Sequence, residues 1–195
     1  MNPTTPIPFL ALLAAVAAAP HFSPPVDNQP LVAARQVALG DGVALCRDAD
    51  GGWRVVAEDG STESYALSFP EFVTVIDRMH DLLPAGGQVI AAYHSGYGPA
   101  IYRGLRAMLR ATDALTASYE AAIRALPTTE LHASVGGHDV RALVERMLLQ
   151  GLKGLRAGRP TLEAQCREQA RGLRDGAIAW SSEHHARNIA RLANL

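Results

Sequence analysis

Reactive side chains and glycines concentrate in one segment of the chain, Tyr93-His-Ser-Gly-Tyr-Gly-Pro99. His94 and Ser95 are the candidate catalytic residues in it, because imidazole transfers protons near neutral pH and an activated hydroxyl is a nucleophile. If residues 88–93 form a strand, the segment is a strand–turn–helix junction whose free backbone N–H groups could hold an anion. The simpler interpretation, and the one we favour, is a glycine-rich structural turn.

Known nucleotide and hydrolase motifs do not fit this segment. A dinucleotide fingerprint would need a glycine at Ile101, and a P-loop would need Gly-Lys-Ser/Thr, which is absent. A nucleophile elbow around Ser95 would need a glycine at Tyr93. The sequence therefore favours a non-enzymatic protein and indicates no cofactor.

The stretch Ala92-Tyr-His-Ser-Gly-Tyr-Gly98 resembles the Ala-Tyr-Asn-Ala-Gly-x-Gly motif of the lytic transglycosylases, which cleave peptidoglycan, and departs from it at His94 and Ser95. As in that family, a helix and a Gly-Gly turn are predicted before it, over Val73–Gly87. The resemblance implies a catalytic glutamate followed by serine on an upstream helix, and then a Gly-Leu-Met-Gln segment.

The chain lacks that catalytic arrangement. Its only Glu-Ser pair, Glu63-Ser64, falls among predicted strands, and no Gly-Leu-Met-Gln follows it. A glycosidase without its acid has no mechanism. A helix at residues 88–93 would favour the transglycosylase alternative, and a strand there would oppose it.

Arginine supplies nearly all the positive charge, with 17 arginines and one lysine, Lys153. A coding bias explains such a total, so the distribution is more informative. Residues 1–97 carry a net charge of −6, and residues 98–195 carry +5. Two helical stripes in the basic half are candidates for binding nucleic acid or another anion. They are Arg103, Arg106 and Arg110, and Arg167, Arg171 and Arg174. The simpler interpretation is a pair of solvated helix faces with internal ion pairs such as Glu163–Arg167.

Histidine and cysteine do not form a recognisable metal site in the sequence. Asp77 and His80 are one helical turn apart, but no third ligand is placed by spacing. The pair His184-His185 would point about 100° apart on a helix. Cys46 and Cys166 have no Cys-x-x-Cys context and are expected to be small core residues. The sequence therefore predicts no metal.

The elements that must position these candidates begin with strand patterns between residues 35 and 67. Short apolar runs alternate with turns such as Gly40-Asp-Gly42, which is a strong local signal for β-hairpins. We expect an antiparallel meander of three or four strands, with Trp53 as its core anchor. A capping box at Ser68-Phe-Pro-Glu71 is predicted to start a helix, and Pro84-Ala-Gly-Gly87 to end it. Residues 88–93 fit either a strand or a helix.

The C-terminal half has the pattern of long helices. Over residues 100–126, one seam recurs at steps of four and three, which predicts a single buried face. The seam comprises Ile101, Leu105, Met108, Thr112, Leu115, Tyr119, Ala122 and Leu126. Asp139 is the predicted N-cap of a second helix that weakens through several glycines, and Thr161 is predicted to cap a third. The inward residues of the third helix are expected to be Leu162, Cys166, Leu173 and Ala177.

An apolar stretch, Ile7–Ala19, lies among prolines near the start of the sequence. Its length suits the hydrophobic region of a secretory signal, but no lysine or arginine precedes it and Pro20 adjoins the expected cleavage site. We therefore expect the stretch to be retained as a short helix that packs on the body, and the protein to be cytoplasmic. The alternative is a periplasmic or secreted protein. No apolar run reaches the roughly 18 residues of a membrane span.

A chain of 195 residues allows one domain or two small ones. The predicted fold class is α+β, with an apolar segment and Pro-rich linker over residues 1–34, a small α+β unit over 35–98 and a helical bundle over 99–195. The predicted function is that of a non-enzymatic accessory protein that presents a helical surface to a partner protein. Nucleic-acid binding through the arginine stripes is the alternative, and a lytic-transglycosylase-like activity is the second alternative.

Overall fold

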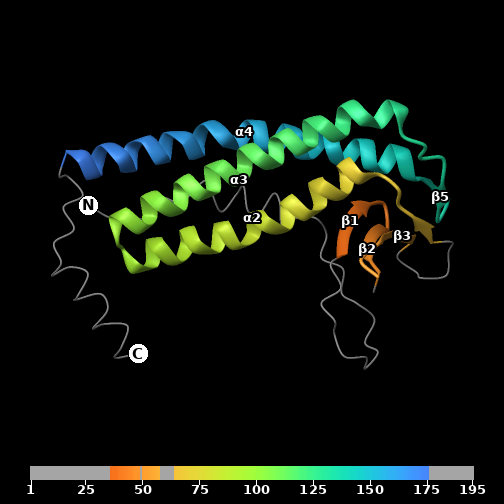
Figure 1. Cartoon of the computed structure of the whole chain (residues 1–195), viewed down its shortest axis with the longest axis horizontal. Coiled ribbons are helices and arrows are strands. Elements are labelled where there is room, and N and C mark those ends of the chain that lie inside the picture. Colours follow the sequence, from red (N-terminus) through yellow and green to blue (C-terminus); the bar gives the residue numbers. More distant parts are fainter. Residues whose placement is uncertain (1–35, 49, 58–63, 176–195) are drawn as a thin grey trace, which may run out of the picture.

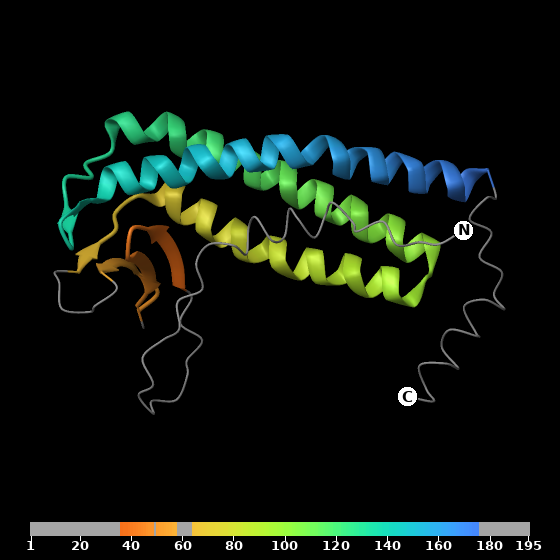
Figure 2. The same ribbon diagram turned by 180° about the vertical axis from the view of Figure 1, so that it is seen from behind.

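The computed structural model describes residues 36–48, 50–57 and 64–175. Four antiparallel strands in chain order form a meander, and three long helices follow it (Figure 1). The sheet lies at one end of the helices, and the turn between the first two helices lies at the other end, as the reverse view also shows (Figure 2). The predicted α+β fold is therefore confirmed.

The meander consists of β1 (Gln36–Gly40), β2 (Val43–Arg47), β3 (Trp53–Ala57) and β4 (Tyr65–Ala66). The predicted turn at residues 40–42 joins β1 to β2, and its three residues all have positive φ, including Asp41 at 54°. Two glycines make this left-handed backbone accessible at little steric cost. Trp53 is 4% exposed, so its predicted place in the core is confirmed.

The first helix, α2 (Pro70–Ser95), does not begin with the predicted capping box. Phe69 is its N-cap, no side chain caps it, and Ser68 is exposed one residue too early. The start is set instead by Pro70, whose φ suits the first helical turn, and by Phe69, which is buried and stacks on Phe72 with ring centroids 5.9 Å apart.

The prediction that α2 ends at Pro84 is also wrong, because the helix continues through that residue to Ser95. Residues 88–93 are consequently helical, not a strand. A proline inside a helix costs about 3 kcal/mol. Burial beyond the proline, including Val89 and Ala92 at 1% and 9% exposed, offsets that cost. Gly96, with φ 65°, ends the helix by donating its N–H to the carbonyl oxygens near the last turn.

The predicted seam is confirmed, since all eight of its residues are buried. Seven of them lie on the second helix, α3 (Gly98–Ala125), and Leu126 follows directly after it. A short 3-10 turn, η1 (Leu126–Thr128), follows it. The helix packs against both neighbours, α2 on one side and the third helix on the other. It is therefore the central helix of the layer.

A small hairpin of β5 (Ser134–Val135) and β6 (His138–Asp139) leads into the third helix, α4 (Val140–Arg174). The predicted N-cap is confirmed, because the Asp139 carboxylate accepts hydrogen bonds from the backbone N–H groups of Arg141 and Ala142. The Arg141 guanidinium in turn donates to the carbonyl oxygens of Leu126 and Thr129, which fixes the start of α4 against the end of α3.

The predicted break before Thr161 does not exist, because α4 runs without interruption for 35 residues, through Pro160. Its apolar face stays buried on both sides of the proline, with Leu155 and Leu162 at 3% and 2% exposed. Gly151 lies directly under Tyr119 of α3, where an added Cβ would fall 2.4 Å from the ring. The glycine thus allows the two helices to approach closely and does not weaken the helix as the sequence suggested.

None of the helices in the described part of the chain combines the length and the apolar character of a membrane span. The predicted parts Ile7–Ala19, Glu63 and Ala177 lie outside the described residues.

Candidate functional site

Both candidate catalytic residues lie in the last turn of α2, directly before the connection to α3. The Ser95 hydroxyl donates to the Ala92 carbonyl oxygen at 2.8 Å and accepts from the Tyr97 N–H at 3.3 Å. It therefore helps to close the end of the helix. The His94 side chain is exposed on the last turn of α2. Both contacts of Ser95 given above are with backbone atoms of the helix end and the connection that follows it.

The helical state of residues 88–93 is the outcome that favours the transglycosylase alternative. Glu63 lies outside the described residues, and Ser64, its neighbour, directly precedes β4 and not a helix. Glu168 of α4 is close enough to Tyr93 to add to the effect of burial, and together they raise the pKa of that tyrosine. This carboxylate belongs to the far helix and does not line the groove described next.

A groove of about 670 Å³ follows the α2–α3 pair near this turn. Its described lining comprises Gln88, Ala91, Ala92, Ser95, Ala100, Tyr102, Arg103, Gly104, Arg106, Ala107 and Arg110. Five of these side chains are alanine or glycine, so backbone and Cβ atoms form much of the surface. All three arginines of the first predicted stripe line it, and no carboxylate occurs among its described residues.

The three groove arginines have no acidic partners in the described structure. Arg103, Arg106 and Arg110 are all exposed, and the described ion pairs of the chain include none of them. The Arg106 guanidinium lies 5.8 Å from the centroid of the Tyr102 ring, which is within the range of a cation–π contact. The groove edge therefore carries three positive charges that the described residues do not neutralise.

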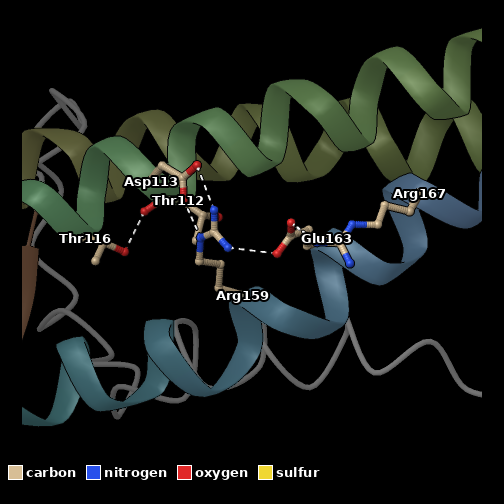
Figure 3. A network of polar contacts seen from close by, with 6 residues as sticks. All are labelled: Thr112, Asp113, Thr116, Arg159, Glu163 and Arg167. Atoms are coloured by element: carbon tan, nitrogen blue, oxygen red, sulfur yellow. Dashed lines mark hydrogen bonds and ion pairs between the residues drawn. The ribbon is translucent and has the colours of Figure 1, made fainter. Parts of the chain in front are cut away.

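The arginines between α3 and α4 have the opposite environment (Figure 3). Arg159 of α4 contacts Asp113 of α3 at 2.7 Å and Glu163 of its own helix at 3.0 Å. Glu163 also pairs with Arg167, as the i,i+4 spacing predicted. A neighbouring bridge joins Arg156 to Glu120 at 2.9 Å. The positive charge of Arg156 and Arg159 is thus balanced by acidic residues of α3 across the helix interface.

The second predicted stripe, on α4, is only partly neutralised. Arg167 pairs with Glu163, and Arg174 lies 3.6 Å from Asp175. Arg171 is exposed, and none of the ion pairs described involves it. The two stripes therefore differ, and the continuous set of unneutralised arginines belongs to α3.

Metal-ligating side chains do not gather into any group of three within the described ranges. Asp77 and His80 are half-buried one turn apart on α2. Cys46 is half-buried on β2 and Cys166 is buried on α4; both are free thiols whose pKa is raised chiefly by burial. Cys166 is thus a core residue as predicted, whereas Cys46 is only partly buried.

The sequence did not predict that residues of α2 form one wall of the groove. Gln88 and Ala91 belong to residues whose secondary structure the sequence left open, so no helix face could be assigned to them. On α3 a signal did exist, because Ala100, Gly104 and Ala107 recur at steps of four and three. That row of small residues indicates a face where another chain segment can approach closely.

No family model, curated protein or solved structure matches this chain. The geometry of the described residues is therefore the basis for any assignment of function.

Proposed function

We propose that this protein is a non-enzymatic interaction protein that presents its α2–α3 face to a partner protein. The observation that supports this most strongly is the edge of the groove, where Arg103, Arg106 and Arg110 stand without acidic partners among the described residues. Arginine suits protein interfaces because its planar guanidinium is weakly hydrated and binds carboxylates with two parallel hydrogen bonds.

The repulsion among the groove arginines supports the same conclusion. Three like charges within one helical face repel one another, and the interaction is unfavourable at i,i+3 and i,i+4 spacing. Farther along the same helix, Asp113 and Glu120 pair with Arg159 and Arg156 of α4. An external group with negative charge would relieve the repulsion among the groove arginines, as these acids neutralise the arginines of α4.

The chemistry of the groove gives little support to catalysis. General acid–base catalysis requires a carboxylate, histidine, lysine or similar group within hydrogen-bond reach of the substrate. The described lining has no carboxylate, histidine, lysine or cysteine. Its one serine, Ser95, has its hydroxyl engaged by the backbone at the helix end, and its one tyrosine, Tyr102, lies beneath the Arg106 guanidinium.

Site-specific photo-crosslinking in the native host tests the proposal. A benzophenone amino acid would replace Ala91 of the α2 wall, Ala107 of the α3 wall, or Leu149, which is 51% exposed on α4. We expect the same protein to be crosslinked from Ala91 and Ala107 and not from Leu149. The combined change Arg103→Gln, Arg106→Gln and Arg110→Gln should abolish both crosslinks. Crosslinks from Leu149 alone, or none at any position, would contradict the proposal.

Nucleic-acid binding is the second candidate, and the same three arginines favour it. If they contact phosphates, affinity for duplex DNA must fall steeply with salt, with a slope of log affinity against log salt of about −0.9 per contact. The triple change on α3 should then flatten the slope by about two to three units. The matched change of Arg167, Arg171 and Arg174 to Gln shows whether the α4 stripe contributes to the salt slope as well. We expect only weak background binding by the unaltered chain.

Peptidoglycan cleavage is a third candidate because residues 88–93 are helical. We expect no soluble fragments to be released when the purified chain is incubated with peptidoglycan. Release that disappears in His94→Ala, with an unchanged melting temperature, would support the catalytic alternative.

The cytoplasmic location is likewise part of the proposal. N-terminal sequencing of the protein from its native host tests it, and a new terminus between residues 19 and 23 would contradict it.

A further inference from the structure

The two walls of the groove differ in charge. The α3 wall carries Arg103, Arg106 and Arg110, whereas the polar side chains on the α2 wall are the neutral Gln88 and Ser95. A ligand that is negative on every side would gain nothing from the α2 wall. A ligand with negative charge along one edge would match both walls.

We infer that the groove binds an amphipathic helix of the partner protein whose acidic side chains lie along one flank, the flank that faces α3. The inference rests on the proposed function and specifies the partner's binding element. Its apolar side chains would enter the groove over the small residues Ala92, Gly104 and Ala107.

The arginine spacing suits a helical partner. Steps of three and four residues place the guanidinium attachment points about 4.5 Å and 6 Å apart along the axis of α3, and about 10.5 Å in total. Glutamates at positions i, i+3 and i+7 of a second helix repeat the same rises. Three carboxylates on one helix flank can therefore meet three guanidinium groups at once, as in the charged flanks of coiled coils.

The dimensions and composition of the groove support a helix over a nucleic acid. The α3 wall extends from Ala100 to Arg110, about 15 Å, so a volume of about 670 Å³ gives a mean cross-section of about 45 Å². That section admits one row of aliphatic side chains, but not the whole of a helix about 10 Å across. Single-stranded nucleic acid would be expected to stack on aromatic rings, and Tyr102, the one aromatic residue in the described lining, lies beneath Arg106.

Three peptides of equal length test the inference by fluorescence anisotropy with the full chain. Each has about 18 residues, an alanine background that supports helix formation, and leucines at heptad spacing. In the one-flank peptide, three glutamates follow at i, i+3 and i+7 on one side of the leucine row. In the split peptide, the same three glutamates are divided between both sides. In the neutral peptide, glutamine replaces glutamate.

The one-flank peptide is expected to bind about tenfold more tightly than the split peptide, and more tightly still than the neutral one. This preference should vanish in the chain with Arg103→Gln, Arg106→Gln and Arg110→Gln and persist in the chain with Arg167→Gln, Arg171→Gln and Arg174→Gln. Unchanged melting temperatures would verify the folding of both variants.

Equal affinity for the three peptides, or tighter binding of a 20-base single-stranded or duplex DNA through the same three arginines, would overturn the inference. Photo-crosslinks from Ala91 and Ala107 that persist despite equal peptide affinities would reject the one-flank helix and retain the proposed function. Absence of both the crosslinks and the peptide preference would reject the one-flank helix and the proposed function together.

Discussion

Two groups of arginines lie along α3 in different electrostatic environments. Arg156 and Arg159 of α4 meet Glu120 and Asp113 across a close helix interface. The three groove arginines of α3 itself form no ion pair with a carboxylate among the described residues. The difference shows that an arginine stripe has no functional meaning until its neighbours are known, because opposite charges at the interface convert the same residue type into a packing contact.

The largest expected effect concerns Tyr119, which lies where α3 crosses α4. Burial raises its pKa to about 12, from 10.0 for a free tyrosine. Because the pKa is higher in the folded chain, the contribution of neutral Tyr119 to the free energy of unfolding is fully present below pH 10. It is lost as the pH rises through 12, and the free energy of unfolding then falls by about 2–3 kcal/mol.

Urea unfolding at pH 8, 10 and 11.5 measures this loss. Tyr119→Phe removes only the hydroxyl, which donates to the Met79 sulfur at 3.4 Å. The Phe variant should therefore lose less stability between pH 8 and 11.5 than the unaltered chain. Equal losses in the two proteins would show that the α3–α4 crossing is not tightly packed.

A pair of glycine variants on α4 gives the next largest effect. Gly151→Ala places a methyl group 2.4 Å from the buried Tyr119 ring, and we expect it to destabilise the chain by about 1–3 kcal/mol. Gly154→Ala meets no atom within 4 Å, so the higher helix propensity of alanine should stabilise by about 0.5–1 kcal/mol. The midpoints of urea unfolding measure the stabilities of the two variants. A Gly151→Ala chain as stable as the Gly154→Ala chain would refute the close approach of the helices.

The ion pairs across the α3–α4 interface should contribute less. Asp113→Asn and Arg159→Gln should each lower the melting temperature slightly, and the double variant should lower it by less than the sum of the two, because the residues are in contact. Added salt should reduce the coupling. Strict additivity would mean that the bridge contributes nothing, and the contrast with the groove side would then lose its electrostatic basis.

The smallest effect on stability is expected at the groove. Changing Arg103, Arg106 and Arg110 together to Gln should leave the melting temperature unchanged or raise it slightly at low salt, because it removes repulsion and breaks no ion pair with a described residue. A clear drop in the melting temperature would show that these arginines serve the fold, and would weaken the case for a binding face.

Sequence alone determined the features that depend on local chemistry or strict periodicity. The glycine-rich turn at residues 40–42, the Asp139 cap and the eight-residue seam of α3 were all predicted, because backbone angles, capping and the helical repeat act over a few residues. The arginines of the candidate site were predicted for the same reason, as a repeat on one helix.

Only the tertiary structure decided where the helices end and which arginines are neutralised. Local rules predicted breaks at Pro84 and before Thr161, yet Val89 beyond the first and Leu162 beyond the second are buried, and this burial offsets the cost of an interior proline. Continuity of α2 through Pro84 creates the second wall of the groove. The i,i+4 partner of Arg167 was predicted locally, but Asp113 and Glu120 reach Arg159 and Arg156 from about 40 positions away, and no local pattern specifies a contact at that separation.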